Sequence, residues 1–496
     1  MNEKKKIAII GAGPGGLAAG LLLGHKGFDV HIFEAKAHPG GRCSSFNLGG
    51  YKFDVGPTFL IMKYLLEEIF KETGRKLEDY VELMPLDPMY RLFFDGAVVN
   101  ISSDKEKTKQ EMEKHFPGHG EGYEQFRIKE KERFERINSI LARPNTDPME
   151  ILTWGFLKNV PKFALTKSVY DVIGNYAEDE RAKLCFTFQA KYLGMSPYEC
   201  PGAFAIIPYV EHEFGIDHVK GGLAELSNGL AKACTEAGVT FHYSTPVKQV
   251  IVENKAIKGV ELDGGERFLA DETIINADFA AAMNKLVPVG ELKKYNPDYL
   301  AKQPYSCSVF MMYLGVKKKY DLQFHNVVFA HDYKRNIINI MKGKLTGPDL
   351  SFYVRNASLI DETLAPEGKS ALYVLVPVPN KFSSINWKEE TAKLRKWTID
   401  GMKERLGMDD IEEMIEEEKI LTPDDFEEDY HVYQGAVFNL AHDLKHMLWF
   451  RPRNKFEELD NCYLVGGGTH PGSGLPTIYQ SGKIAADLIA QKYKAQ

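Results

Sequence analysis

Cysteine is scarce in this chain, and its spacing argues against two kinds of site. No two of the six cysteines have CxxC or zinc-ligand spacing. Free thiols in a reducing compartment are therefore expected, and no metal site is predicted. The cysteines are Cys43, Cys185, Cys200, Cys234, Cys307 and Cys462.

Long apolar runs and a basic excess are also missing. No uninterrupted apolar stretch approaches the roughly 20 residues of a membrane-spanning helix. The apolar start KIAII breaks into glycines, which predicts no signal peptide. The 62 basic and 69 acidic side chains leave a net charge of −7, so nucleic acid is not an expected partner. We expect a cytoplasmic protein that is soluble or lies on a membrane surface.

The chain does contain a glycine-rich turn near its start, in the setting of a dinucleotide-binding unit. The apolar run 6–10 predicts a buried strand, and GAGPGG follows it, ahead of an Ala- and Leu-rich helix and a second strand, FDVHIF. Gly11 allows the tight turn, Gly13 brings backbone N–H groups to a pyrophosphate, and Gly16 lets helix and strand pack closely. Glu34 closes the second strand and is predicted to bind a ribose. A purely structural turn is the alternative.

The residues that follow favour a flavin over a nicotinamide cofactor. In PGGR, Gly41 lets the chain pass the pyrophosphate and Arg42 neutralises it, with a surface salt bridge as the alternative for Arg42. The sharp bend of Gly56, Pro57 and Thr58 is predicted to line the flavin ring.

A second glycine-rich turn, YLVGGGTHPGSGLP, lies near the other end of the chain. Residues 463–465 predict a last strand, which Gly466 and Gly467 end against the cofactor. Residues 470–476 are predicted to form a floor under the ring. A helix beginning near Thr477 and Ile478 would aim its N-terminal N–H groups at the ring.

From end to end the chain resembles bacterial-type carotenoid desaturases, a group of amine-oxidase-like flavoproteins. The matching stretches include FDVGPTFL, HVKGGLAEL, YSCSVFMMYLGV, HNVVFAHDY, LAPEGKSALYVLVPVPN, AVFNLAHDLKHMLWFRPRN and LVGGGTHPGSGLP. The resemblance implies FAD as cofactor, a long apolar isoprenoid substrate such as phytoene or dehydrosqualene, and insertion of double bonds. It also implies that Val247 meets the adenine, and it leaves quinone or oxygen as electron acceptor. YSCSVFMMYLGV and HNVVFAHDY look closer to the dehydrosqualene type.

The expected fold is α/β (α+β), with a discontinuous Rossmann-type FAD-binding domain. That domain takes residues 1–100, 218–285 and 425–496. A mixed-sheet substrate domain takes the insertions 101–217 and 286–424, together with a helical membrane-associating part. The acidic run 409–418, DDIEEMIEEE, predicts a solvated helix face.

No catalytic base is predicted. His470 lies in the turn that faces the ring, but a hydrogen-bonding turn residue is the favoured interpretation. Asp54 is interpreted as a turn-forming residue rather than a catalytic one. Four residues before the KGG motif either line the site or form a loop face: Glu211, Glu213, Asp217 and His218.

The stretch 149–173 mixes apolar, aromatic and basic side chains, as interfacial segments do. A substrate without polar groups makes docking on a membrane expected, because leaving the bilayer for an apolar tunnel avoids crossing water. A pair of ordinary core helices is the alternative for this stretch.

Three other functions remain open. An oxygenase or ketolase acting at a terminal methyl would use the same scaffold. A non-catalytic isoprenoid carrier would share the fold without needing flavin. An amine oxidase would need an aromatic cage beside the flavin, which the sequence does not locate.

Overall fold

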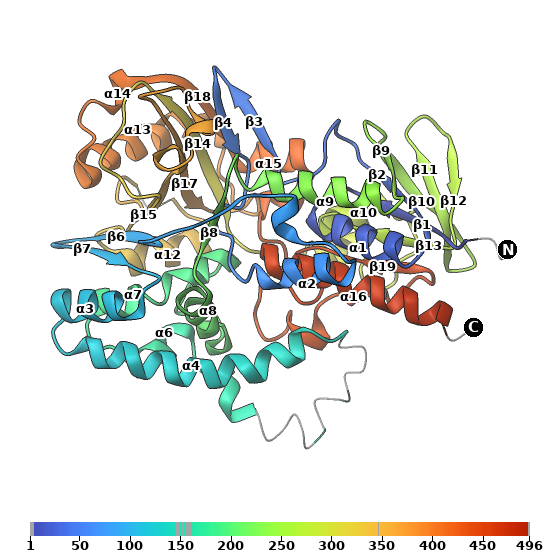
Figure 1. Cartoon of the computed structure of the whole chain (residues 1–496), viewed down its shortest axis with the longest axis horizontal. Helices are drawn as coiled ribbons and strands as arrows, with labels where there is room; N and C mark the ends of the chain where they lie inside the picture. The colour runs from blue at the N-terminus through green and yellow to red at the C-terminus, as the bar shows by residue number, and fades with distance from the viewer. Residues whose placement is uncertain (1–3, 145–148, 150–152, 154–159, 346, 495–496) are drawn as a thin grey trace.

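The computed structural model describes residues 4–144, 149, 153, 160–345 and 347–494 (Figure 1). The stretch 149–173 lies partly outside them, including its residues Ile151, Leu152, Trp154, Phe156, Leu157 and Lys158. Within the described residues, no helix combines the length and the apolar character needed to cross a bilayer.

Five parallel strands form the sheet that carries both glycine-rich turns (Figure 1). Their order is β19 (Cys462–Leu464), β13 (Glu272–Ile275), β1 (Lys6–Ile10), β2 (Asp29–Phe33) and β9 (Thr240–His242). Each neighbouring pair is parallel. The turns that follow β1 and β19 therefore lie at the same carboxyl edge of the sheet, where open α/β sheets bind ligands.

Alternating side chains of β1 build a core on each face of this sheet. Ile7 and Ile9 pack on one face, against α1 (Pro14–His25), and Ala8 and Ile10 pack on the other. The first face is also covered by α2 (Tyr64–Glu72), α9 (Ala224–Glu236) and α16 (Leu475–Lys494). The second is covered by α10 (Phe279–Lys285) and the antiparallel sheet of β10 (Val247–Glu253), β11 (Ala256–Leu262) and β12 (Arg267–Leu269).

A seven-stranded mixed sheet forms the other large layer (Figure 1). Its order is β18 (Ile415–Leu421), β14 (Ser308–Val316), β17 (Ser370–Val378), β16 (Phe352–Asn356), β15 (His325–Val328), β6 (Tyr90–Phe94) and β7 (Ala97–Ile101). One face packs on α13 (Trp387–Leu406), and the opposite face packs on the hairpin of β3 (Ser45–Leu48) and β4 (Tyr51–Asp54). Both faces of the central strands are therefore buried.

Helices gather below the two sheets in Figure 1. They are α3 (Lys105–His115), α4 (His119–Leu141), α6 (Val169–Ile173), α7 (Glu180–Leu184) and α8 (Ile206–Phe214). A further helix, α12 (Tyr333–Met341), is drawn at the level of β6 and β7. The strands β5 (Leu83–Pro85) and β8 (Asp217–Val219) pair next to them. The remaining short helices are α11 (Pro297–Leu300), α14 (Ile411–Met414) and α15 (Pro423–Tyr430).

The acidic run 409–418 is not one solvated helix, so that prediction is wrong. Only α14 is helical, and the chain then extends into β18, which pairs with β14 at the sheet edge. Neighbouring cations neutralise the carboxylates: Lys369 binds Glu416 at 2.5 Å, and Arg395 binds Glu418 at 2.9 Å. Pairing with a neighbouring strand outweighs the helical preference of the glutamates.

The division into domains stays a prediction. The segment given to the cofactor domain, 1–100, includes β6 and nearly all of β7, which pair within the seven-stranded sheet. This pairing favours a boundary before β6.

Candidate active site

One cavity of about 1100 Å³ runs from the carboxyl edge of the parallel sheet to the seven-stranded sheet and the helices. All of the predicted cofactor residues except Gly16 line it. Those lining residues are Gly11, Gly13, Glu34, Gly41, Arg42, Gly56, Pro57, Thr58, Val247, Gly466, Gly467, Thr477 and Ile478. Residues from three distant regions of the sequence, 11–58, 247 and 466–478, therefore line one cavity.

The first turn can be built only with glycine. Gly11 has φ +96°, and a Cβ there would lie 2.5 Å from the Asn276 carbonyl oxygen. A Cβ on Gly16 would collide with the Gly11 carbonyl oxygen, which explains why Gly16 packs inside the turn and not on the cavity. The side chain of Asn276, at the end of β13, donates hydrogen bonds to the carbonyls of Gly11 (2.8 Å) and Gly13 (3.3 Å).

Asn276 also lines the cavity, and the sequence pattern did not single it out. The sequence feature that could have identified Asn276 is its position directly after a buried strand. That strand, β13, pairs with β1 in the fold.

Glu34 stands over the first turn at the end of β2. Its carboxylate accepts hydrogen bonds from the backbone N–H groups of Ala12 (2.8 Å) and Lys36 (2.9 Å). These bonds hold the acid beside the turn, and Glu34 lines the cavity.

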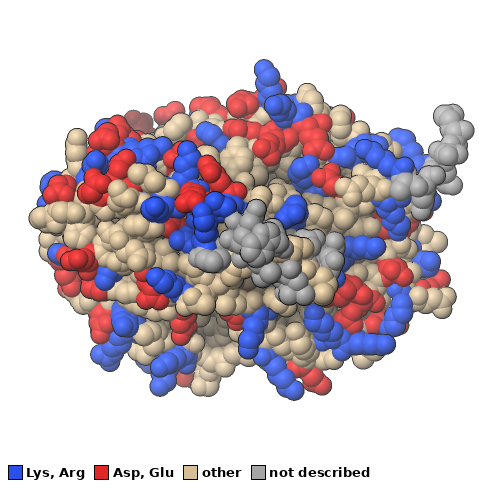
Figure 2. Space-filling view, turned by 90° about the horizontal axis from the view of Figure 1, so that it is seen from below, with Lys and Arg blue, Asp and Glu red and all other residues tan. Residues whose placement is uncertain are grey.

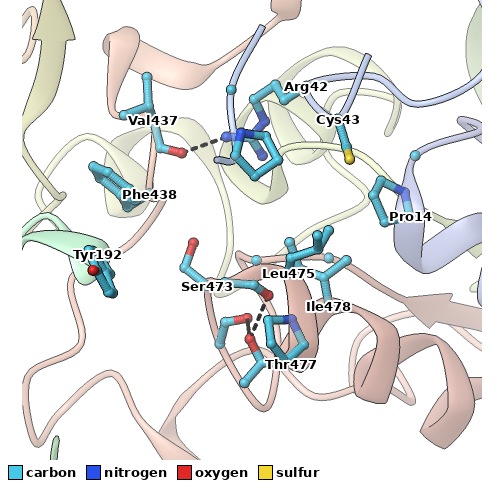
Figure 3. A pocket seen from close by; sticks show the side chains of 18 of the residues that line it. Pro14, Arg42, Cys43, Tyr192, Val437, Phe438, Ser473, Leu475, Thr477 and Ile478 are labelled. Carbon is cyan, nitrogen blue, oxygen red and sulfur yellow. Dashed lines mark hydrogen bonds between the residues drawn. The ribbon is translucent and has the colours of Figure 1, made fainter. Parts of the chain in front are cut away.

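Arg42 is half-buried and is not a surface ion pair. Its Nη1 donates to the Val437 carbonyl oxygen at 2.6 Å (Figure 3). Among the described residues no carboxylate forms a salt bridge with it. Burial lowers the pKa of the guanidinium, and the charge of Asp278 partly offsets this effect. A half-buried cation without a paired anion, on the wall of a cavity, suits a phosphate ligand.

The bend 56–58 is tied to the seven-stranded sheet by two tyrosines. Tyr373 donates to the Gly56 carbonyl at 2.7 Å, and Tyr353 donates to the Thr58 hydroxyl at 3.2 Å. Both rings line the cavity, with centroids 6.0 Å apart at 69° to each other.

Asp54 has a structural role just before this bend. Its carboxylate accepts from the N–H groups of Leu223 and Ala224, each at 3.0 Å, and so caps the start of α9. It also pairs with buried Arg355 at 2.7 Å. Asp54 does not line the cavity.

The second turn brings the start of α16 to the cavity. The helix begins at Leu475, two residues before the predicted start. The Thr477 hydroxyl donates back to the carbonyls of Gly472 (3.0 Å) and Gly474 (2.8 Å), and Ser473 and Leu475 project into the same space (Figure 3).

His470 lies outside the lining of the cavity. Its Nε2 is 2.8 Å from the Arg143 carbonyl oxygen, and burial lowers the pKa of the imidazole to about 4. The ring is therefore neutral and holds the turn, in line with the favoured interpretation.

The four acidic and histidine candidates before KGG also lie behind the wall. His218 bonds Asp361 at 2.8 Å, Asp217 pairs with Lys63 at 2.9 Å, and Glu213 pairs with Lys105 at 2.8 Å. Glu211 is fully buried and bonds Gln189 at 2.9 Å. None of the four lines the cavity.

The far part of the cavity is walled mainly by hydrocarbon. Aromatic and aliphatic side chains come from α4, α8, the short helix 188–193, β14 and β17. Residues along its course include Phe59, Phe134, Ile137, Phe188, Tyr192, Phe204, Ile207, Val309, Leu375 and Phe438. Such a wall suits a long apolar ligand.

The wall near the first turn fits FAD. Backbone N–H groups at the start of α1, unpaired Arg42 and the Glu34 carboxylate are the donors and acceptors that a pyrophosphate and a ribose require. The start of α16, which lines the same cavity, would supply partial positive charge to a flavin ring bound beside it.

Comparisons with known proteins agree. Residues 14–490 match the model of the family described as flavin containing amine oxidoreductase. The chain is 49% identical to a 4,4'-diapophytoene desaturase (4,4'-diapolycopene-forming) of Methylomonas sp, over 100% of this chain and 97% of that protein. It is 36% identical to a zeta-carotene-forming phytoene desaturase of Myxococcus xanthus, over 100% and 96% of the two chains.

Among solved structures, an oxidoreductase from Methanosarcina mazei superposes with a TM-score of 0.64 at 15% identity, covering 98% of this chain and 100% of that one. This likeness shows the fold alone.

The fold and the site define an FAD-dependent oxidoreductase. More particularly, the chain belongs to the carotenoid desaturases of the flavin-containing amine oxidoreductase family.

Proposed function

We propose that this enzyme desaturates 4,4'-diapophytoene, the thirty-carbon carotenoid precursor. The observation that carries the proposal is the apolar cavity that continues directly from the glycine-rich turns. The 49% identity with a 4,4'-diapophytoene desaturase supports the thirty-carbon substrate over phytoene.

The chemistry divides between cofactor and protein. When bound, FAD supplies a ring that accepts a hydride from the substrate. The chain's own task is to align a flexible polyene beside that ring and to keep water out. The aromatic side chains of Tyr353 and Tyr373 line the cavity at the bend 56–58, Phe438 lines it as well, and these rings would exclude water from it. Partial positive charge from the start of α16 favours a reduced, anionic ring.

Colour tests the substrate directly. The gene is expressed in bacteria that make either 4,4'-diapophytoene or phytoene, and absorption spectra of the extracts are recorded. With the thirty-carbon precursor we expect absorption to move into the visible range, because desaturation lengthens the conjugated system. With phytoene we expect a much weaker change. A preference for phytoene would contradict the proposed chain length, and an oxygenated product would favour the oxygenase. The Gly467→Val variant is the control without cofactor.

We also propose that the enzyme docks peripherally on a membrane through its helical side. Ile128 on α4, Phe214 at the end of α8 and Phe450 are 54%, 41% and 55% exposed. The same regions contribute Phe134 and Met447 to the cavity wall, so exposed apolar side chains lie along the route inward. Figure 2, seen from below, shows Lys and Arg side chains spread over this side among acidic and uncharged residues.

Co-sedimentation with liposomes tests the docking. Phe450→Glu and Phe214→Glu together should weaken binding to vesicles containing anionic lipid, because charges replace inserted apolar side chains. Val289→Glu is the matched control, since Val289 is fully exposed on the loop after α10. Unchanged sedimentation of the double variant would contradict the proposal that this surface docks on the membrane.

The electron acceptor is proposed to be a quinone or oxygen. Anaerobic reoxidation of reduced enzyme by a soluble quinone, compared with reoxidation in air, separates the two. An enzyme that neither acceptor reoxidises would contradict the proposal.

A further inference from the structure

A buried carboxylate lies behind the cavity wall where Tyr192 stands. Tyr192 lines the cavity with Phe438, opposite the Ser473–Leu475 turn (Figure 3). Glu211, on α8, is 0% exposed, and its Oε2 accepts hydrogen bonds from Gln189 (2.9 Å) and Tyr90 (3.3 Å).

The Tyr192 hydroxyl faces the Glu211 carboxylate and is near enough to hydrogen-bond it, which raises the pKa of Tyr192 and, against the larger effect of burial, lowers that of Glu211. Among the described residues, neither the Tyr192 hydroxyl nor the second oxygen of Glu211, Oε1, has a short hydrogen bond to any other group. Both atoms are buried. The charge of Glu211 is near enough to add to the effect of burial, which raises the pKa of Tyr192 well above its usual value. A hydroxyl donor and a carboxylate acceptor thus face each other beside the cavity.

A row of polar groups continues from Glu211 away from the cavity. The Tyr90 hydroxyl is 3.3 Å from His212 Nε2, and His212 Nδ1 is 3.0 Å from the hydroxyl of Tyr123 on α4. The guanidinium of Arg127, which is partly exposed, lies 5.9 Å from the centre of the Tyr123 ring. Hydrogen-bonding groups therefore connect the cavity wall with the outer layer of helices.

Burying the Glu211 carboxylate costs free energy, which a residue with only a packing role would avoid. Among the described residues the carboxylate has no cationic partner, and burial raises its pKa to about 7. The groups facing it are Gln189 and Tyr192 on the short helix 188–193 and Tyr90 on β6. Beyond them lie His212, Tyr123, Cys185, Arg127 and Lys105. An apolar side chain of similar size would be cheaper at this position.

We propose that Glu211, acting through Tyr192, receives the proton that desaturation releases from the substrate. The inference builds on the proposed function. Desaturation removes a hydride and a proton from neighbouring carbons, and the electron pair of the second C–H bond becomes the new double bond. The proton passes to the Tyr192 oxygen as the Tyr192 O–H proton moves to Glu211 Oε1. The proton then leaves by the row Tyr90, His212 and Tyr123.

Lys191 is the competing acceptor. It lines the cavity beside Tyr192, its Nζ lies 4.8 Å from the centre of the Tyr333 ring, and burial lowers its pKa to about 7. No carboxylate among the described residues pairs with it. A variant at this position is therefore needed to tell the two groups apart.

The experiment is anaerobic single-turnover flavin reduction by 4,4'-diapophytoene in detergent, measured across neutral pH. In the wild type the rate should fall as pH drops through about 7, because a protonated Glu211 accepts no proton. Glu211→Gln should slow reduction at least about 100-fold and remove this pH dependence, in the range seen for lost general bases. Tyr192→Phe should remove it as well, and Lys191→Met should keep it.

A spectroscopic readout does not depend on turnover. In infrared difference spectra of the holoenzyme, a protonated carboxyl band that titrates near neutral pH should be lost in Glu211→Gln. The matched control is Glu130→Gln, another fully buried carboxylate, which is paired with Arg133 at 2.6 Å and bonded by Tyr176 at 2.9 Å. This control should leave the rate, its pH dependence and the band unchanged.

Three outcomes would overturn the inference. They are wild-type rate and pH dependence in Glu211→Gln, loss of the pH dependence in Lys191→Met, and no titrating band. A wild-type enzyme that reduces its flavin with neither 4,4'-diapophytoene nor phytoene would instead overturn the proposed function, and the inference with it. Equal flavin content in all variants shows that they fold.

Discussion

At the scale of single residues, buried charges hold the site's framework. Asp54 is 4% exposed, binds Arg355 and caps α9 with the same carboxylate. Removing one partner of such a pair leaves an uncompensated charge in the interior.

Asp54→Ala should therefore destabilise the enzyme by about 3–5 kcal/mol. Asp54→Asn should cost less, because the amide oxygen still accepts from one of the two N–H groups. The thermal midpoint at fixed FAD concentration measures both. Glu213→Ala, which breaks the partly exposed pair with Lys105, is the control and should change stability by at most about 1 kcal/mol. Equal midpoints for Asp54→Ala and this control would contradict the assigned role.

Glycine is required in the second turn because neighbouring atoms lie close to its backbone. A Cβ on Gly467 would lie 2.8 Å from the Ser473 hydroxyl oxygen and 3.1 Å from the side-chain nitrogen of Asn439. Gly467 also lines the cavity.

Gly467→Val should abolish FAD retention, because the side chain would displace the turn 471–476 or enter the cofactor space. The ratio of flavin to protein absorbance after purification is the measurement. Gly264→Val is the control, since no heavy atom lies within 4 Å of the position that a Cβ would take there, and its φ lies outside the left-handed region. A Gly467→Val protein that purifies yellow would refute the assignment.

At the scale of elements, helix-to-helix packing positions the second turn. α16 crosses α1 at close range, where a Cβ on Gly482 would collide with the Gly15 carbonyl oxygen and lie 3.1 Å from the Ala18 Cβ. The start of α16 and the N-terminus of α1 both reach the cavity, so the spacing of the two helices sets the spacing of the two turns.

Gly482→Leu should lower stability by about 1–3 kcal/mol through overpacking and should also weaken FAD binding. Thermal unfolding and flavin titration of the stripped protein report the two effects. Gln491→Leu, at an exposed position of the same helix, should change neither. Normal FAD affinity in a destabilised Gly482→Leu protein would separate packing from cofactor binding.

Elements also show where local patterns predict structure and where they do not. The first turn was predictable because strand, glycines, helix and second strand are contiguous and each has its own periodicity. The run 409–418 was not, because the position of β14 decides whether its glutamates lie on a helix or a strand. Asn276 was missed because its role depends on β13 lying beside β1, far away in sequence.

At the scale of the whole molecule, the cavity joins the layers. Its walls include residues that follow β1, β2 and β19 and residues of the seven-stranded sheet and the helices. A cofactor bound in this cavity would add contacts between the parallel sheet and the layers formed by the seven-stranded sheet and the helices.

Added FAD should therefore raise the free energy of unfolding of the stripped protein by about 2.7 kcal/mol when free FAD is about 100 times its Kd. The thermal midpoint should rise with it. Differential scanning fluorimetry with FAD and with riboflavin is the measurement. Riboflavin lacks the groups expected at Arg42 and Glu34, so it should give a smaller shift. Equal shifts would show that these residues do not contribute to cofactor binding.

The sequence by itself determined the two glycine turns, because their strands, glycines and helices are neighbours along the chain. Its end-to-end resemblance to carotenoid desaturases pointed to FAD and to the reaction class. The cofactor contacts stay a prediction, and all but one of the predicted residues line the cavity. Only the tertiary structure decided that His470 and Asp54 support the wall and do not face the cavity, that Arg42 is half-buried without a paired anion, and that Glu211 lies behind Tyr192. Burial and hydrogen bonding are set by residues from distant strands and helices, and no local pattern records which of them become neighbours.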